Sequence, residues 1–130
     1  MGVIGLASID GLTAADLIHR RLTALPASAS VADLLAYFDG SSSHKLALLV
    51  DGERFAGALT PADIPADADR AAPAASLART EPSISAVAPA QEARDAALAQ
   101  PSGRMPVVGE DGALIGVVAI NRARDAFCGT

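Results

Sequence analysis

The sequence predicts a mixed α/β fold of the α+β type, built from two copies of one βαββα unit. Three observations support this prediction: an apolar hairpin pattern occurs twice, a helical pattern precedes each copy, and a glycine stands at the same place in both hairpins. Repetition of this kind indicates supersecondary units that share a core. A chain of 130 residues is long enough for one domain or two half-sized units.

Each hairpin consists of two short apolar runs separated by an Asp-Gly turn. The paired runs are 46–50 with 55–59 and 105–108 with 114–118. Asp-Gly between apolar runs is a strong hairpin signal, because glycine accepts the positive φ that a tight turn needs. The second strands carry Gly57 and Gly116, which predict a bulge or the close approach of another backbone or a ligand.

A helix is expected ahead of each hairpin. In the first copy Ser30 is a candidate N-cap, and apolar residues follow at helical spacing from Val31 to Phe38. The second helix is expected at 93–98. Short strands are expected before the helices, at 21–25 and 83–87. After the hairpins we expect a brief helix at 61–64 and a longer one at 122–127.

These elements set the predicted boundaries. Residues 1–11 form an N-terminal segment, 12–66 the first repeat, 67–76 an Ala- and Pro-rich linker, and 77–128 the second repeat.

The composition limits the partners. The formal net charge is −5 and the basic residues are scattered, whereas polyanion binding needs clustered Lys and Arg. We therefore expect no nucleic-acid partner. Hydrophobic residues make up 51% of the chain and aromatic residues 3%, so the core must consist of Ala, Val, Leu and Ile. Such a core favours a second chain that covers apolar surface, and we expect a homodimer.

The expected location is the cytoplasm. No apolar run approaches the roughly 18 residues of a membrane helix, and the apolar N-terminus lacks the basic start of a signal peptide. The single cysteine, Cys128, has no disulfide partner within the chain, which fits a reducing compartment. No membrane association is expected.

The order of these elements resembles the CBS (cystathionine β-synthase) domain, and two in tandem resemble a Bateman module. The stretches nearest the family pattern are 57–63 (Gly-Ala-Leu-Thr-Pro-Ala-Asp), 106–108 (Pro-Val-Val) and 87–89 (Val-Ala-Pro). The likeness extends from about Thr13 to Phe127. It implies two units packed sheet against sheet about a pseudo-twofold axis, with two clefts. In many family members a cleft holds an adenosine-containing ligand, and the module regulates an enzyme or transporter.

The resemblance places a ligand site at Thr60, Pro61 and Asp63. A carboxylate at Asp63 can accept hydrogen bonds from both ribose hydroxyls. Thr60 stands where a strand enters a helix and can meet a phosphate, and Pro61 suits the first helical position. The alternative is that Thr60-x-x-Asp63 is only a helix cap.

Other residues join this site by family position. His44 and Lys45 precede the strand of the first hairpin, and Arg104 precedes that of the second. These basic groups are expected to neutralise phosphate, although each is also an ordinary charge at a strand start. The adenine walls are expected at Leu22 or Thr23 and at Leu46 and Ala47, which are equally core residues.

The second repeat departs from the pattern, with Ala119 in place of threonine and Arg122 in place of aspartate. Arginine cannot accept ribose hydrogen bonds, so we expect this cleft to be empty or to bind an anion differently. The sequence offers no catalytic triad, metal spacing or Gly-rich phosphate loop, and we expect no enzyme activity and no certain cofactor.

The sequence therefore predicts a stand-alone regulatory CBS pair. It would bind AMP, ATP, NAD or S-adenosylmethionine and signal through a change in conformation or dimer packing to an enzyme or transporter in trans. The alternative is a protein–protein adaptor that keeps the fold and has lost the ligand, in which case replacing Asp63 would have no effect.

Overall fold

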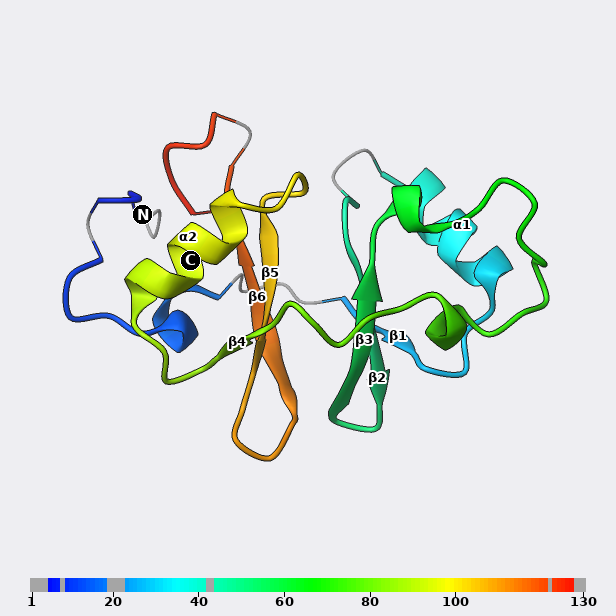
Figure 1. Ribbon diagram of the computed structural model, residues 1–130, viewed down its shortest axis with the longest axis horizontal. Helices are drawn as coiled ribbons and strands as arrows, with labels where there is room; N and C mark the ends of the chain where they lie inside the picture. Colours follow the sequence, from blue (N-terminus) through cyan, green and yellow to red (C-terminus); the bar gives the residue numbers. More distant parts are fainter. Residues whose placement is uncertain (1–4, 8, 19–22, 42–43, 122, 128–130) are drawn as a thin grey trace. The chain divides into compact units, whose positions relative to one another are not determined.

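The computed structural model describes residues 5–7, 9–18, 23–41, 44–121 and 123–127 (Figure 1). Contacts between residues divide the chain into two compact units. The repeat-1 unit is Thr23–Glu81, and the repeat-2 unit combines Met1–Leu22 with Pro82–Thr130. No helix among the described residues combines the length and the apolar character that crossing a membrane requires.

The repeat-1 unit contains a three-stranded sheet with the order β1-β2-β3. Its elements are β1 (Leu25–Pro26), α1 (Val31–Asp39), β2 (Ala47–Asp51), β3 (Arg54–Leu59) and two 3-10 turns, η2 (Pro61–Asp63) and η3 (Ala74–Ser76). β1 runs parallel to β2, and β2 runs antiparallel to β3. The expected first hairpin is therefore confirmed, and Gly52 in its turn has a φ of +65°.

The repeat-2 unit has the same order, β4-β5-β6. Its elements are β4 (Ile84–Ser85), α2 (Ala90–Leu98), β5 (Arg104–Val108), β6 (Leu114–Ala119) and the 3-10 turn η1 (Ala14–Leu17). β4 is parallel to β5, and β5 is antiparallel to β6. The mixed α/β class and the second hairpin are confirmed.

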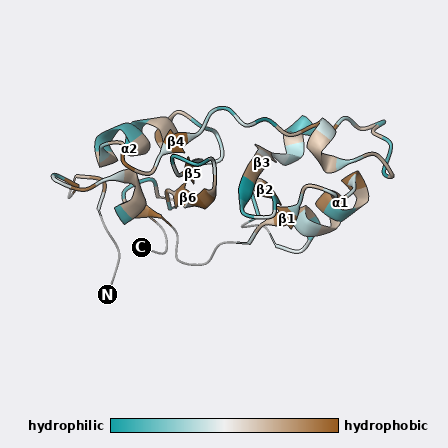
Figure 2. Ribbon diagram, turned by 90° about the horizontal axis from the view of Figure 1, so that it is seen from below, coloured by the Kyte–Doolittle hydropathy of each residue, from teal (hydrophilic) through white to brown (hydrophobic). Residues whose placement is uncertain are grey.

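The helix α1 begins as its sequence predicts. The backbone N–H of Asp33 donates to Ser30 Oγ at 3.2 Å, and the N–H of Ser30 donates to Asp33 Oδ2 at 3.0 Å. This reciprocal box satisfies donors that the first helical turn leaves open. Val31 and Leu34 are buried, and Leu34 belongs to the core that includes residues of the sheet. Both α1 and α2 carry hydrophobic and hydrophilic residues side by side (Figure 2), as amphipathic helices do.

Both hairpins contain an irregularity next to their glycine. Leu49 pairs with Gly57, but the next pair is Val50 with Phe55, so Ala56 has no partner. The second hairpin has the same shift between Val107 and Val108, beside Gly116. A residue without a partner on the opposite strand defines a β-bulge. The bulge predicted from the glycines is thus present in both repeats.

The same glycines also allow close approach. A Cβ at Gly57 would lie 2.8 Å from the Cβ of Ala78, and a Cβ at Gly116 would lie 2.9 Å from the Cβ of Ile18. In each unit the residue that fills this space comes from the segment ahead of the other repeat. The close approach of another backbone, the alternative to a bulge, is thus found at Gly57, where the Arg79 backbone nitrogen would lie 3.3 Å from the added Cβ, whereas at Gly116 the neighbour is the side chain of Ile18.

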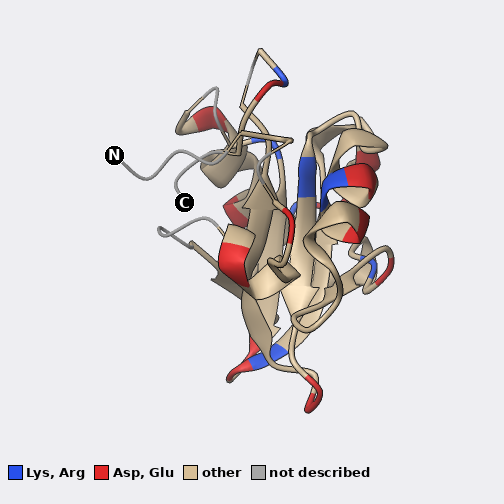
Figure 3. Cartoon of the chain, turned by 90° about the vertical axis from the view of Figure 1, so that its left-hand side faces the viewer, with Lys and Arg blue, Asp and Glu red and all other residues tan. Residues whose placement is uncertain are grey.

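Each unit has its own apolar core. The repeat-1 core consists of small residues and leucines from α1, β2, β3, η3 and the residue Ala29 ahead of α1: Ala29, Leu34, Ala47, Leu49, Leu59 and Ala74. The repeat-2 core joins α2, β5 and β6 to residues of both termini: Ile9, Ala14, Leu17, Ala90, Ala93, Ala97, Met105, Val107, Val118, Ile120 and Phe127. Acidic residues lie at the turns of both hairpins (Figure 3).

The packing departs from the predicted boundaries at two places. Residues 12–22 were assigned to the first repeat, but they belong to the repeat-2 unit. There the N–H of Ala14 donates to Ala88 O at 2.9 Å, and the N–H of Ala90 donates to Leu12 O at 3.0 Å. The stretch 67–76 is more than a linker, because Ala74 is completely buried in the repeat-1 core. These contacts join residues far apart in the sequence, which local patterns do not record.

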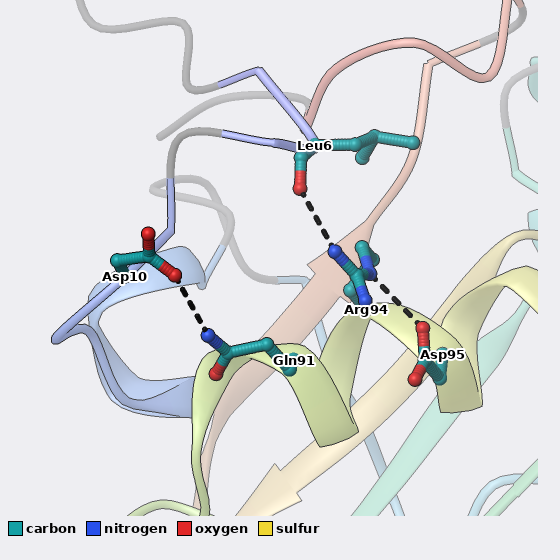
Figure 4. A network of polar contacts seen from close by, with 5 residues as sticks. All are labelled: Leu6, Asp10, Gln91, Arg94 and Asp95. Atoms are coloured by element: carbon teal, nitrogen blue, oxygen red, sulfur yellow. Dashed lines mark hydrogen bonds and ion pairs between the residues drawn. The ribbon is translucent and has the colours of Figure 1, made fainter.

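The N-terminal segment 1–11 also joins the repeat-2 unit. Arg94 Nη1 of α2 donates to Leu6 O at 3.3 Å, and Gln91 Nε2 donates to Asp10 Oδ1 at 3.2 Å (Figure 4). Arg94 also pairs with Asp95 at 2.9 Å. The segment is thus held against one helix by hydrogen bonds that α2 supplies.

The helix expected at 122–127 is not formed among residues 121 and 123–127. The Asn121 side chain instead accepts from the N–H of Asp125 at 3.0 Å and of Ala126 at 3.3 Å. An asparagine side chain that bonds nearby backbone competes with a helix. The short strands are found near their predicted positions, since β1 overlaps 21–25 and β4 overlaps 83–87. Residues 21 and 22 lie outside the described residues. The brief helix predicted at 61–64 corresponds to the 3-10 turn η2.

Candidate functional site

The predicted ligand residues stand where β3 gives way to η2. The backbone N–H of Thr60 donates to Asp63 Oδ2 at 2.8 Å, and Thr60 Oγ1 donates to the same oxygen at 3.1 Å. Pro61 occupies the start of the 3-10 turn, where its missing N–H costs nothing. Thr60 and Asp63 are both half-buried and Pro61 is exposed. The structure therefore brings the three residues together.

The same arrangement occurs a second time in the chain. At the start of η1, the N–H of Thr13 donates to Asp16 Oδ2 at 2.8 Å, and Thr13 Oγ1 donates to it at 3.1 Å. Thr13 and Asp16 have no ligand role in the predicted site. The capping alternative therefore accounts for the contact between Thr60 and Asp63 as it stands.

One feature of Asp63 remains available for a ligand. Both of its recorded hydrogen bonds reach Oδ2, and across the described part of the chain nothing donates to Oδ1. A carboxylate oxygen has two lone pairs for acceptance. The cap can thus persist while Oδ1 accepts hydrogen bonds from a hydroxyl group.

The basic residues ahead of β2 differ in their surroundings. His44 stacks on Tyr37 with ring centroids 4.2 Å apart, and its Nδ1 lies 2.6 Å from Tyr37 O. Since a carbonyl oxygen only accepts, Nδ1 carries the proton and Nε2 is left for other contacts. Lys45 is exposed. His44 is thus anchored to the end of α1, while Lys45 is free to reach a ligand.

The residues expected to line the adenine differ in how far they are buried. Ala47 pairs with Leu59 and is completely buried in the repeat-1 core, so its side chain belongs to the core and not to an open wall. Leu46, just ahead of it, is half-buried, and Thr23 is exposed. Leu22 lies outside the described residues.

Arg104 belongs to the repeat-2 unit, where it begins β5. Its Nη1 donates to Ser102 O at 2.6 Å, and its N–H donates to Ser102 Oγ at 3.2 Å. The guanidinium is therefore held by the loop that precedes its strand. Its other N–H groups bond to none of the described residues and remain for an anion.

The end of β6, which corresponds to the end of β3, has Ala119 and Arg122 where the first repeat has Thr60 and Asp63. Ala119 ends β6 and is buried, and the chain continues in an extended form, with the Ile120 N–H donating to Gly103 O at 2.8 Å. Ile120 then forms a bridge with Phe127. Arg122 lies outside the described residues. The described residues that follow β6 thus lack a 3-10 turn like the one that carries Asp63.

Sequence reasoning missed one residue near the site. Arg79 forms a β-bridge with Ala58, two residues before Thr60. The chain pattern gave no signal of it, because an isolated bridge has no periodicity. Within the described residues, no group of three or more His, Cys, Asp or Glu side chains could hold a metal ion.

The comparisons with known proteins bear on the fold. The CBS domain family model matches residues 74–128, from η3 through β6. Among curated proteins nothing matches. The cystathionine β-synthase pair domain of SO5017 from Shewanella oneidensis MR-1 superposes with a TM-score of 0.72 at 21% identity, covering 82% of this chain and 64% of that one. The chain folds as a CBS-domain pair.

Two further similar structures contain nucleotides. CBSX2 from Arabidopsis thaliana, solved in complex with AMP, has a TM-score of 0.70 at 22% identity, covering 88% of this chain and 92% of that one. The cytosolic domain of the Mg²⁺ channel MgtE, in complex with ATP, has a TM-score of 0.68 at 21% identity and 88% coverage. The CBS pair described here spans only 48% of that MgtE chain.

Proposed function

We propose that this CBS pair is a regulatory module that binds an adenosine-containing ligand at Thr60 and Asp63 of the repeat-1 unit. The observation that carries the proposal is the placement of both residues at the end of β3, with Asp63 Oδ1 unoccupied by any donor of the described residues. The AMP and ATP in structures of the same fold support the ligand class. NAD and S-adenosylmethionine belong to that class too.

Each residue has a physical role in this proposal. Asp63 Oδ1 accepts hydrogen bonds from the ribose hydroxyls, as acidic residues do in other nucleotide folds. Thr60 Oγ1 lies beside the same carboxylate and contacts the sugar or phosphate. Leu46 and Thr23 line the base. Lys45 supplies positive charge for a phosphate, and the neighbouring His44 ring offers a further polar contact.

The proposal extends to signalling. The module works as a homodimer in the cytoplasm and controls an enzyme or transporter in trans. The similarity to the cytosolic domain of the Mg²⁺ channel MgtE supports a transport protein as the target. It catalyses no reaction itself. A ligand shifts such a module only by binding one of its conformations more tightly than another.

A second function is favoured by a specific observation. Because Asp16 makes the cap that Asp63 makes, with equal distances, Asp63 needs no ligand to explain its presence. The chain would then be an adaptor that binds a protein partner and no nucleotide.

Calorimetric titration with AMP, ATP, NAD and S-adenosylmethionine distinguishes the two functions. Asp16→Ala is the matched control for Asp63→Ala, since both substitutions remove a carboxylate that caps a 3-10 turn. We expect the wild type and Asp16→Ala to bind at least one of these compounds, and Asp63→Ala to bind it about ten-fold or more weakly. Absence of heat from all four at millimolar concentration would favour the adaptor.

A further inference from the structure

The chain that follows η3 lies along the free edge of β3. The Ala58 N–H donates to Arg79 O at 2.8 Å, and the Arg79 N–H donates to Ala58 O at 3.0 Å. β2 occupies the other edge of β3, so Arg79 extends the sheet by one bridge. Figure 1 shows this segment, coloured green, passing β3. The bridge thus places a positively charged residue, which belongs to none of the three strands, at the edge of the sheet.

Gly57 fixes the position of this segment. A Cβ at Gly57 would lie 2.8 Å from the Cβ of Ala78 and 3.3 Å from the Arg79 nitrogen. The segment therefore packs directly on the glycine backbone. Because two hydrogen bonds and this contact act on adjacent residues, the register of Arg79 against Ala58 is well defined.

This register places Arg79 on the same face as Thr60. Side chains of directly opposed residues share a face of a sheet, and side chains alternate along a strand. Leu59 points into the core, so Ala58, Thr60 and Arg79 lie on the opposite face. Thr60 has extended backbone angles, with φ −105° and ψ 167°, which continues the alternation.

Arg79 and Thr60 are diagonal neighbours in this arrangement. Diagonal pairs across antiparallel strands are about 7–8 Å apart, within reach of a long side chain. Arg79 is exposed, and its guanidinium forms no ion pair or hydrogen bond with any described residue. A free guanidinium near a carboxylate-and-hydroxyl pair is suited to bind a phosphate in two-pronged fashion.

We propose that Arg79 binds the phosphate of the ligand held by Thr60 and Asp63, so that the module prefers a phosphorylated adenosine to the nucleoside. This inference rests on the proposed function, and it adds a residue that lies outside the motif of 57–63. The cation matters because the chain carries a formal charge of −5, which opposes anion binding wherever no basic group is near.

The test compares AMP with adenosine. Calorimetric titrations of the wild type, Arg79→Ala and Arg79→Lys use both compounds. We expect Arg79→Ala to weaken AMP binding by about 10- to 100-fold and to leave adenosine binding unchanged. Arg79→Lys keeps the charge without the two-pronged geometry, so its affinity for AMP should lie between those of the wild type and Arg79→Ala.

Arg54→Ala is the matched control. Arg54 is exposed and begins β3 at the end away from Thr60, so its loss changes the net charge equally and should leave both affinities as they are. If the wild type and Arg79→Ala bind AMP equally, the role of Arg79 is overturned while the proposed function stands. A wild type that binds neither compound overturns the proposed function as well. Since Arg79 uses its backbone for the bridge, Arg79→Ala should melt within a few degrees of the wild type.

Discussion

Replacement of Gly57 by alanine tests the close packing of the repeat-1 unit. Gly57 has a φ of +138°, and holding a non-glycine residue in such a conformation costs about 1–3 kcal/mol. The added Cβ would lie 2.8 Å from the Ala78 Cβ. Ala78 has no flexible side chain to move, so the backbone must shift, and overpacking of this kind costs about 1–3 kcal/mol. We expect Gly57→Ala to lower the free energy of unfolding by roughly 2–6 kcal/mol.

Two other glycines separate the contributions. Gly52 has a φ of +65° and nothing within 4 Å of an added Cβ, so Gly52→Ala should cost only the conformational term, about 1–2 kcal/mol. A Cβ at Gly116 would lie 2.9 Å from the Ile18 Cβ, and no positive φ is found there. Gly116→Ala should therefore cost only the packing term, about 1–3 kcal/mol.

Urea denaturation followed by far-UV circular dichroism measures all three variants. The double variant Gly57→Ala/Ala78→Gly removes the contacting Cβ and should recover the packing term while the conformational term persists. The reasoning is refuted if Gly57→Ala costs no more than Gly52→Ala, or if Ala78→Gly gives no recovery in the Gly57→Ala background.

Three further substitutions test stability by the same assay. Ser30→Ala removes the acceptor for the Asp33 N–H and should cost about 1 kcal/mol; an unchanged midpoint would mean that the cap does not form in solution. Phe127→Ala empties a completely buried site and should cost about 3–5 kcal/mol, whereas a cost under 1 kcal/mol would show that the C-terminal segment is not part of the core. Asn121→Ala leaves the N–H groups of Asp125 and Ala126 without their acceptor and should cost about 1–3 kcal/mol; a helical gain in circular dichroism would instead support the helix predicted at 122–127.

Local signals in the sequence were enough for the hairpins and for α1. The Asp-Gly turns, the Ser30 cap and the helical spacing act within a few residues, and the structure has each of them. Gly57 and Gly116 also predicted bulges, because a glycine in a strand has few other uses. The partner of each glycine could not be predicted, since Ala78 and Ile18 lie far along the chain.

Two kinds of contact account for the errors: contacts over long sequence separations, and local bonds from a side chain that compete with a helix. Nothing in residues 12–22 indicates that Ala14 bonds to Ala88, so these residues were assigned to the wrong side of the division. The helix expected at 122–127 failed because the Asn121 side chain bonds the backbone of residues that a helix would need. Arg79 was missed for the related reason that a single bridge leaves no pattern.

The sequence predicted which residues come together at the candidate site, but it did not decide whether they form a ligand site or only a helix cap. Thr60, Pro61 and Asp63 do come together, but the same hydrogen bonds join Thr13 and Asp16. A Thr-x-x-Asp sequence forms a cap by itself, so the short-range geometry is the same whether or not a ligand binds.

The most direct measurement of the central claim is a crystal structure of the full chain grown with millimolar AMP. The account predicts AMP density beside Thr60, with the ribose hydroxyls within hydrogen-bond distance of Asp63 Oδ1 and the phosphate near Arg79. AMP bound elsewhere, or a site beside Thr60 that contains only water at that concentration, would contradict it.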